Sequence, residues 1–330
     1  MKATKSSGRG VPPMAELPEA EEIDLEDVVR QYMAGKYDLI CVLGPTASGK
    51  TGYAVKAARL VRTMAEKGIV PEGTRGEILS ADSRQVYRGM DIGTGKDLGE
   101  YGDVPCHLID IAEAGSKYNI YEYQRDFEKA WTEIRERGNV PILCGGSGLY
   151  IEAATRGYSL PDVPADPELR EKLGQTGTEE LIRMFESLKT PHNSTDYDTR
   201  KRLIRAIEIA LYEKEHPVSR TESLPKSTYY IGTLVTREER NSRIDRRLEA
   251  RLGEGMVDEV RKLLEQGLDT EDLIYYGLEY KFVTLYLCGV LGYEDMKKLL
   301  ATAIHQFAKR QMTWFRGMER KGVRIHWVRV

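Results

Sequence analysis

Long apolar runs are absent from this sequence. No stretch approaches 18 consecutive apolar residues, so we expect no membrane-spanning helix, and the amino terminus lacks the apolar core of a signal peptide. Cysteine is scarce as well: the chain has four and no C-x-x-C pair, which argues against a zinc site. We therefore expect a cytoplasmic protein with reduced, structural thiols at Cys41, Cys106, Cys144 and Cys288.

A strong charge of either sign is also absent. The formal net charge is -3, which gives no global sign of a polyanionic partner. Positive charge is nevertheless concentrated in residues 200–205 and in residues 305–330, where seven Lys or Arg face a single acid. Each basic run fits either a solvated helix face or a surface that binds RNA.

One stretch has the pattern of a phosphate-binding loop. An apolar run at residues 39–43 ends in Gly-Pro-Thr-Ala-Ser-Gly-Lys-Thr, and a helix-forming run follows. In such a P-loop, an ATP-binding motif, backbone N–H groups and the helix start face phosphate oxygens, and the last hydroxyl can bind Mg²⁺. The alternative is a glycine-rich turn without a ligand. We assign phosphate binding, with Thr51 as the metal ligand, to Gly44, Pro45, Thr46, Ala47, Ser48, Gly49, Lys50 and Thr51.

Two acids at the ends of strand-like runs are candidates to work beside the phosphate. Asp110 is either a metal-binding acid or a structural carboxylate, and we favour the structural interpretation. Asp82 is followed by Ser83 and Gln85, a set suited to accepting a proton and to hydrogen bonding a base edge. The alternative for Asp82 is a cap on the following turn.

Strand-like runs alternate with helical ones through most of the chain. This order predicts an α/β fold, a P-loop NTPase-like parallel sheet with helices on both faces. The strands are expected at residues 39–43, 77–82, 107–111, 140–144, 229–235 and 323–328.

The predicted domains follow from where strand signals stop. Residues 160–222 contain several prolines and no strand signal, which predicts a small inserted all-helical subdomain. The catalytic core would then comprise residues 37–159 and 223–330. Residues 1–36 form a partly flexible extension with one helix near residues 24–34.

Five ordered motifs together resemble the tRNA dimethylallyltransferase family, also called tRNA isopentenyltransferases. The first motif is the P-loop. The second is the segment 82–96, which contains Asp-Ser-x-Gln-x-Tyr and Asp-Ile-Gly-Thr-x-Lys. The other three are Gly-Gly-Ser-Gly-Leu-Tyr at residues 145–150, Arg-Leu-Ile-Arg-Ala-Ile-Glu at residues 202–208 and Lys-Arg-Gln-Met-Thr-Trp-Phe-Arg at residues 309–316. The resemblance covers residues 38–328, nearly the whole folded chain.

The resemblance implies transfer of a dimethylallyl group from dimethylallyl diphosphate to N6 of adenine 37, next to the tRNA anticodon. Asp82 would accept the proton from the attacking amine. Lys50, with Mg²⁺ on Thr51, would stabilise charge on the leaving diphosphate. Ser147 would lie near the RNA, and Thr94 and Lys96 would steady the diphosphate or its loop.

The resemblance also implies a surface for the tRNA anticodon stem-loop, bound by a monomer. RNA binding is assigned to residues of the matching motifs: Asp82, Ser83, Arg84, Gln85, Ser147, Arg170, Lys201, Arg202, Leu203, Ile204, Arg205, Tyr280, Lys281, Lys309, Arg310, Gln311, Trp314 and Arg316. Departures from the family pattern include Glu279, which stands where glycine is usual, and His305-Gln306, which stands where Thr-Arg is common and removes one cation. We hypothesise that the added charge at Glu279 alters which tRNAs are accepted.

Three other functions remain open on the sequence alone. A prenyl transferase acting on free AMP or ADP would need neither the subdomain nor the basic carboxyl-terminal helix. A small-molecule P-loop kinase would need an arginine-bearing lid, a role the segment 82–96 does not fit. A non-catalytic tRNA-binding paralogue is suggested by Glu279 and His305.

Overall fold

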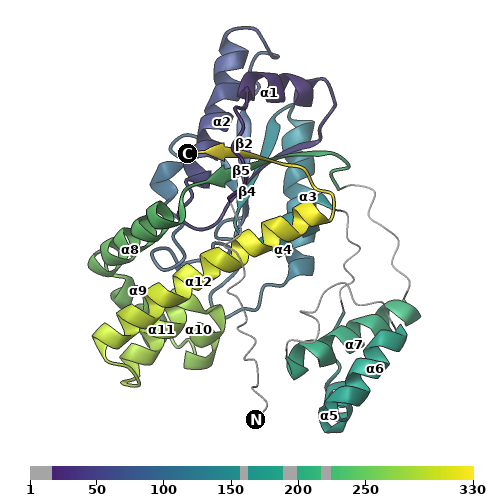
Figure 1. Ribbon diagram of the computed structural model, residues 1–330, viewed down its shortest axis with the longest axis vertical. Coiled ribbons are helices and arrows are strands. Elements are labelled where there is room, and N and C mark those ends of the chain that lie inside the picture. Colours follow the sequence, from purple (N-terminus) through teal and green to yellow (C-terminus); the bar gives the residue numbers. More distant parts are fainter. Residues whose placement is uncertain (1–16, 157–162, 189–198, 217–223) are drawn as a thin grey trace, which may run out of the picture.

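A six-stranded parallel sheet forms the centre of the protein (Figure 1). The computed structural model describes residues 17–156, 163–188, 199–216 and 224–330. The strand order is β3-β2-β4-β1-β5-β6, and every neighbouring pair is parallel. The strands are β1 (Leu39–Leu43), β2 (Gly76–Ala81), β3 (Cys106–His107), β4 (Val140–Gly145), β5 (Thr228–Leu234) and β6 (Ile325–Arg329).

Helices connect the strands and extend the molecule below the sheet. Those of the sheet layer are α1 (Leu25–Met33), α2 (Lys50–Glu66), α3 (Ile120–Glu136), α4 (Gly148–Thr155) and the short 3-10 helix η1 (Leu98–Glu100). The remaining helices are α5 (Pro167–Gln175), α6 (Thr178–Leu188), α7 (Arg200–Glu215), α8 (Arg237–Gly253), α9 (Met256–Glu265), α10 (Thr270–Tyr276), α11 (Leu278–Leu287) and α12 (Tyr293–Arg320).

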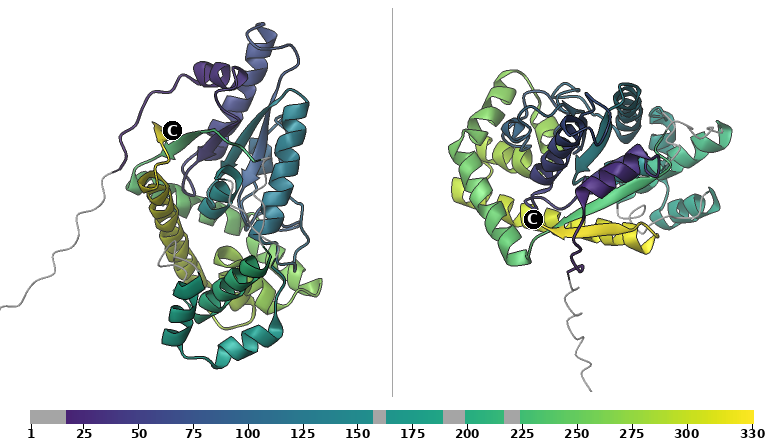
Figure 2. Two further views of the ribbon diagram at one scale, coloured as in Figure 1. Left: turned by 90° about the vertical axis from the view of Figure 1, so that its right-hand side faces the viewer. Right: turned by 90° about the horizontal axis from the view of Figure 1, so that it is seen from above.

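Both faces of the sheet are covered, which confirms the predicted α/β fold. Along β1, Ile40 and Val42 pack in a cluster with α1 and α2, whereas Leu39, Cys41 and Leu43 pack with α3, α4 and α12. The alternation follows from the period of two in a strand. Figure 2 shows these helices on either side of the strands. All four cysteines are free thiols, as expected.

The expected strand at residues 107–111 is wrong in its length. Only Cys106 and His107 pair with β2, because Leu108 (φ 64°) and Asp110 (φ 55°) have left-handed backbone that a strand cannot contain. The chain instead turns toward the loop after β2, where the N–H groups of Ile111 and Ala112 donate to the carbonyl of Val86. Apolar composition hid this turn from the sequence pattern.

Helices α5–α7 form a separate packing unit. Leu173, Leu181, Phe185, Leu203 and Ile207 make a cluster of their own. In Figure 1 these helices lie at the lower right, and α8–α11 lie at the lower left. The boundaries predicted at residues 160 and 222 fall outside the described residues, so they stay predictions.

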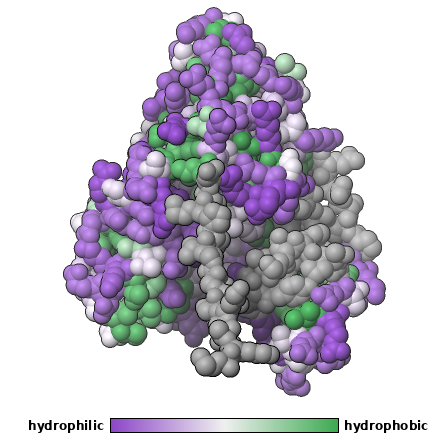
Figure 3. Space-filling model, viewed as in Figure 1, coloured by the Kyte–Doolittle hydropathy of each residue, from purple (hydrophilic) through white to green (hydrophobic). Residues whose placement is uncertain are grey.

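The long helix α12 runs diagonally below the strands (Figure 1). It packs against α8 and α11 near its start and against α4 further along. Where α11 and α12 meet, Val290, Tyr293 and Leu299 are exposed. The space-filling view shows several hydrophobic areas, one of them at the lower left, on a mostly hydrophilic face (Figure 3). Among the described residues, no helix combines the length and the hydropathy that crossing a bilayer requires.

Candidate active site

A cleft of about 260 Å³ lies at the carboxyl edge of the sheet, where the loops after β1, β2 and β4 meet. Parallel strands bring these loops to one edge, as expected for this fold class. A larger hollow of about 1320 Å³ involves the segments before β5 and β6, and none of the predicted site residues lines it. The cleft is lined by Thr46, Ala47, Gly49, Lys50, Thr51, Asp82, Gln85, Thr94, Gly95, Asp97, Glu100, Tyr101, Cys144, Gly145, Arg243 and Arg247.

The Gly44–Thr51 loop combines a left-handed glycine at the start of a helix with close packing on β5. Gly49 (φ 81°) is the N-cap of α2 in left-handed conformation, so the helix begins at Lys50 beside the cleft. At Gly44 a Cβ atom would lie 2.2 Å from Thr233 Oγ1, so the close packing of this turn requires glycine. Ser48 Oγ and Thr233 Oγ1 are 2.6 Å apart and tie the loop to β5.

Gln311 fastens the same loop from α12. Its Oε1 accepts from the Thr46 N–H at 2.8 Å, and its Nε2 donates to the Gly146 carbonyl at 3.0 Å. The side chain is buried. Gln311, predicted from its motif to contact RNA, therefore has its amide bonded within the protein, between the loops after β1 and β4.

Asp82 and Ser147 lie on neighbouring loops, after β2 and β4. Asp82 Oδ1 accepts from the Arg84 N–H at 2.9 Å, which caps the turn, and the half-buried carboxylate also lines the cleft. Ser147 Oγ accepts from the Ser83 N–H at 3.0 Å and lies 3.3 Å from Ser83 Oγ. Ser147 thus fixes the turn that presents Asp82 to the cleft.

The cations of the cleft are poorly solvated. Burial lowers the pKa of Lys50, although Cys144 and Asp82 act to raise it. Burial also lowers the pKa of Arg247, helped by the neighbouring Arg251. A cation that is partly removed from water is destabilised unless a negative charge lies beside it. Such cations therefore favour the binding of an anion, whose charge stabilises them.

Arg243 and Arg247 are functional candidates that the sequence reasoning missed. Arg247 Nη2 donates to Thr46 Oγ1 in the Gly44–Thr51 loop, and both arginines line the cleft. The signal was present, because residues four apart lie on one face of a helix. Ile244 and Leu248, which lie one position after each arginine, form an apolar stripe on the adjacent face of α8, and this stripe dominates the sequence pattern.

Oxygen ligands for a cation are present at the cleft. Thr51, Asp97 and Glu100 all line it, and burial, followed by the charge of Asp97, raises the pKa of Glu100. The described residues contain no group of three or more His, Cys, Asp or Glu placed to hold a metal. Mg²⁺ typically takes one or two protein oxygens and completes its shell with phosphate and water, so these residues fit it.

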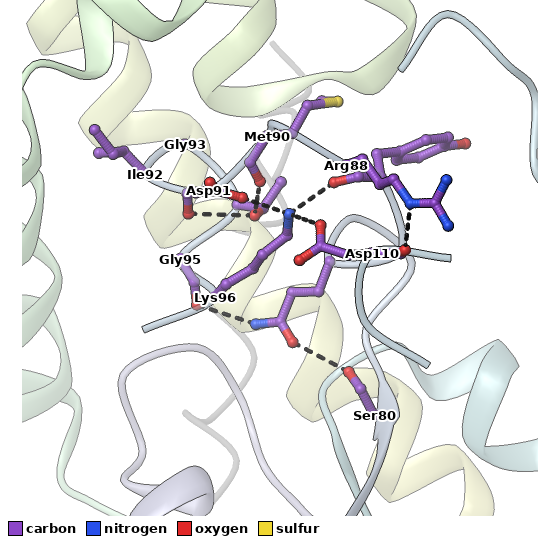
Figure 4. Close-up of polar contacts among 12 residues, drawn as sticks. Ser80, Arg88, Met90, Asp91, Ile92, Gly93, Gly95, Lys96 and Asp110 are labelled. Atoms are coloured by element: carbon purple, nitrogen blue, oxygen red, sulfur yellow. Dashed lines mark hydrogen bonds and ion pairs between the residues drawn. The ribbon is translucent and has the colours of Figure 1, made fainter. Parts of the chain in front are cut away.

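Lys96 does not line the cleft, and its side chain points toward Asp91 and Asp110 (Figure 4). Its Nζ donates to the Tyr87 carbonyl at 2.7 Å and to Asp91 Oδ1 at 2.6 Å, and it also pairs with Asp110. Its side chain is only 1% exposed. Lys96 therefore holds its own loop together, and Asp110 has the structural role that we favoured.

Gln85 and Thr94 line the cleft but are bonded within the wall. Gln85 accepts from Ser80 Oγ at 3.1 Å and donates to the Gly95 carbonyl at 3.0 Å (Figure 4). Thr94 Oγ1 donates to the Met90 carbonyl. Both side chains thus lie at the cleft, and the hydrogen bonds named here join them to nearby residues of the same wall.

The predicted RNA residues fall into two groups. Arg170, which is exposed, and Arg205, which is half-buried, both pair with the buried Glu208, with Arg170 Nη2 at 2.8 Å from Glu208 Oε2. Tyr280 and Leu203 are buried, Ile204 is half-buried, Trp314 Nε1 donates to Glu152 at 2.8 Å, and Arg316 lies 3.4 Å from Glu319. Besides Arg170, the exposed residues of the set are Lys201, Arg202, Lys281, Lys309 and Arg310.

The two departures from the family pattern face α8. Burial raises the pKa of Glu279, against the charges of Arg251 and Arg247, so this carboxyl belongs to the surroundings of the cleft. His305 Nε2 lies 2.8 Å from Asp245 Oδ1. His305 thus joins α12 to α8. The effect of Glu279 on tRNA choice stays a prediction.

A family model described as IPP transferase matches residues 85–318, more than half of the chain. The chain belongs to this family. A tRNA dimethylallyltransferase of Porphyromonas gingivalis is 55% identical over 294 residues, covering 88% of this chain and 93% of the relative. One of Parabacteroides distasonis is 54% identical over 296 residues, covering 88% and 92%.

Solved structures agree with this membership. The tRNA isopentenylpyrophosphate transferase of Bacillus halodurans has a TM-score of 0.61 at 32% identity, covering 88% of this chain and 89% of its own. A eukaryotic dimethylallyltransferase acting on tRNA has a TM-score of 0.65 at 21% identity, covering 84% and 69%, and shows the fold alone. The family is thus established from sequence and fold together.

Proposed function

We propose that this protein is a tRNA dimethylallyltransferase, which moves the dimethylallyl group of dimethylallyl diphosphate to N6 of adenine 37 beside the tRNA anticodon. The observation that carries the proposal is one cleft lined by both Asp82 and the cationic set of Lys50, Arg243 and Arg247. Relatives with that activity in their names, at about half identity over most of the chain, support it. The AMP-directed, kinase and non-catalytic alternatives are not favoured.

The chemistry assigns a separate task to each side of the cleft. As the C–O bond of the substrate breaks, its electron pair leaves with the diphosphate, whose charge Lys50 and Arg247 stabilise. N6 forms the new bond to carbon. The N6 proton passes to Asp82, whose Oδ1 is held by the Arg84 N–H and whose second oxygen is the acceptor.

Mg²⁺ belongs to the proposal as the ion that neutralises charge on the diphosphate when bound. Thr51, with Asp97 or Glu100, would hold it. Inorganic diphosphate titrated calorimetrically with and without Mg²⁺ tests this assignment without measuring turnover. We expect tighter binding with Mg²⁺, and expect Thr51→Val to remove most of that gain; equal binding in both conditions would exclude Thr51 as a ligand.

The RNA partner is proposed to be the anticodon stem-loop. Lys201 and Arg202 on α7, Lys281 on α11, and Lys309 and Arg310 on α12 would contact its phosphates, since all five are exposed. The target base must leave its stack to reach the cleft. We also propose that the protein acts in the cytoplasm and as a single chain.

One assay tests the proposed reaction. The full chain is incubated with labelled dimethylallyl diphosphate and either an unmodified anticodon stem-loop or AMP. We expect label in the stem-loop only, at the adenine next to the anticodon. Label in AMP alone would replace the proposal with a small-molecule transferase, and label in neither would overturn it.

A further inference from the structure

One carboxylate outside the cleft holds the backbone of the Asp91–Gly93 segment. Glu259 of α9 accepts through Oε2 from the N–H groups of Asp91 at 2.8 Å and Ile92 at 2.7 Å. Through Oε1 it accepts from the Gly93 N–H at 3.0 Å and from the Tyr280 hydroxyl at 2.6 Å. A carboxylate has about four lone-pair positions, so these four donors use its full capacity.

The same segment is held from its other side by Lys96, whose ammonium binds Asp91 Oδ1 at 2.6 Å (Figure 4). At Gly93 a Cβ atom would lie 2.8 Å from the Tyr280 ring, so this segment packs directly on α11. An anion on its backbone and a cation on its side chain therefore fix the segment between the sheet layer and helices α9 and α11.

The residues that follow this segment form a wall of the cleft. Thr94, Gly95 and Asp97 all line it. Gly95 packs so closely on α8 that a Cβ atom would lie 1.8 Å from Arg251 Nη2, and Asp97 Oδ2 is 3.2 Å from the same atom. A shift of the Asp91–Gly93 segment would therefore move this wall against the cationic helix α8.

We propose that Glu259 is a positioning residue for the diphosphate substrate. It touches no lining residue of the cleft directly, and acts through the backbone it holds. The inference rests on the proposed function, because the cleft is taken to bind dimethylallyl diphosphate. Loss of the Glu259 charge should loosen the wall that faces the diphosphate and leave the RNA-binding helices α7 and α12 in place.

The test compares Glu259→Gln with wild type in the full chain. Charge-assisted hydrogen bonds are among the stronger ones, and partial loss of this set should raise the KM for dimethylallyl diphosphate roughly tenfold. The KM for the stem-loop and kcat should each change by less than about twofold, which is far below the tenfold change that corresponds to about 1.4 kcal/mol. Amide exchange at Asp91, Ile92 and Gly93 should accelerate, which a role elsewhere would not produce.

The matched control is Asp258→Asn, the neighbouring exposed carboxylate on α9, which pairs with Arg261. It should leave both KM values and the exchange of residues 91–93 unchanged. Tyr280→Phe removes a single donor to Glu259 and should raise the KM for dimethylallyl diphosphate by a smaller factor, which keeps the test available if Glu259→Gln folds poorly.

Three results would overturn the positioning role. They are equal rises in both KM values, a fall in kcat alone, or unchanged exchange at residues 91–93 in Glu259→Gln. Failure of the proposed function is distinguishable, because wild type would then transfer no label. Binding of inorganic diphosphate and amide exchange would still report on Glu259 in that case.

Discussion

Asp82 combines a structural contact with the proposed chemistry. Its Oδ1 caps the turn through Arg84, and its carboxylate also lines the cleft near Lys50. The sequence offered capping and proton transfer as alternatives, and the geometry allows both at once. Each oxygen of one carboxylate can have its own partner.

Replacing Asp82 with Ala tests its proposed part in proton transfer. General-base assistance is typically worth about 10²–10⁴ in rate, so we expect kcat to fall by that range in the label-transfer assay. The dissociation constants for inorganic diphosphate and for the stem-loop should stay within about threefold of wild type, which is less than the tenfold change that corresponds to about 1.4 kcal/mol. Asp103→Ala, at an exposed acid paired with Arg62, is the control and should transfer normally. Near wild-type turnover by Asp82→Ala would exclude Asp82 as the base.

At the scale of the element, α12 connects regions with different tasks. Near one end it meets α8 and α11, and further along Gln311 holds the Gly44–Thr51 loop. Lys309 and Arg310 are exposed two residues and one residue before Gln311. Exposed cations on a helix whose other face is buried are suited to RNA phosphates.

The double substitution Lys309→Ala, Arg310→Ala tests α12 as an RNA-binding element. We expect the KM for the stem-loop to rise while the KM for dimethylallyl diphosphate is retained. In a plot of the logarithm of RNA affinity against the logarithm of salt concentration, the slope should become shallower by about one for each lost phosphate contact. Lys298→Ala, at an exposed lysine earlier in α12, provides the control. An unchanged salt slope in the double variant would show that these side chains do not bind phosphate.

Elements with a strong local signal could be predicted from the sequence. The helix expected near residues 24–34 agrees with α1 within a few residues. The cleft was also within reach, because the carboxyl ends of parallel strands meet at one edge. Gly49, Lys50, Thr51 and Asp82, which come from two of these strand ends, line one cleft.

What the sequence could not supply was the distant partner of each polar side chain. Lys96 and Tyr280 have residue types suited to ligands, yet their contacts are Asp110 and Glu259. Arg170 likewise meets Glu208, on α7. A motif specifies the type and neighbours of a residue, and tertiary packing decides which way its side chain points.

At the scale of the whole molecule, Glu77 ties the sheet to its surroundings. Its side chain is 5% exposed, and its Oε2 lies 2.6 Å from His107 Nε2 on β3 and 3.0 Å from Arg137 after α3. Asn139 also donates to it at 2.5 Å. Burial alone would raise the pKa of Glu77, but the hydrogen bonds from Asn139, Arg137 and His107 outweigh it and lower the pKa.

This arrangement predicts how stability depends on pH. Because the folded pKa lies below the unfolded value of 4.5, Glu77 contributes stability above that pH, and the contribution is lost as pH falls through the folded pKa. Glu77→Gln should lower the free energy of unfolding by about 2 kcal/mol near neutral pH. The difference from wild type should shrink below the unfolded value in urea titrations.

Glu66→Gln serves as the control for this measurement, because Glu66 is exposed and its pair with Arg62 is a surface contact. It should change stability by less than about 0.5 kcal/mol at any pH. A Glu77→Gln deficit that stays constant into acid would mean that charge at Glu77 does not supply the stabilisation.

The amide of Gln311 has a further consequence for how the two substrates influence each other. It joins the loop proposed to bind the diphosphate to the helix proposed to bind the RNA. A ligand that moves the loop therefore also changes the hydrogen bonds that hold the helix, and a ligand that moves the helix changes those that hold the loop. Thermodynamic linkage then requires reciprocity: the factor by which RNA changes diphosphate affinity equals the factor by which diphosphate changes RNA affinity. In Gln311→Met both factors should move toward unity together.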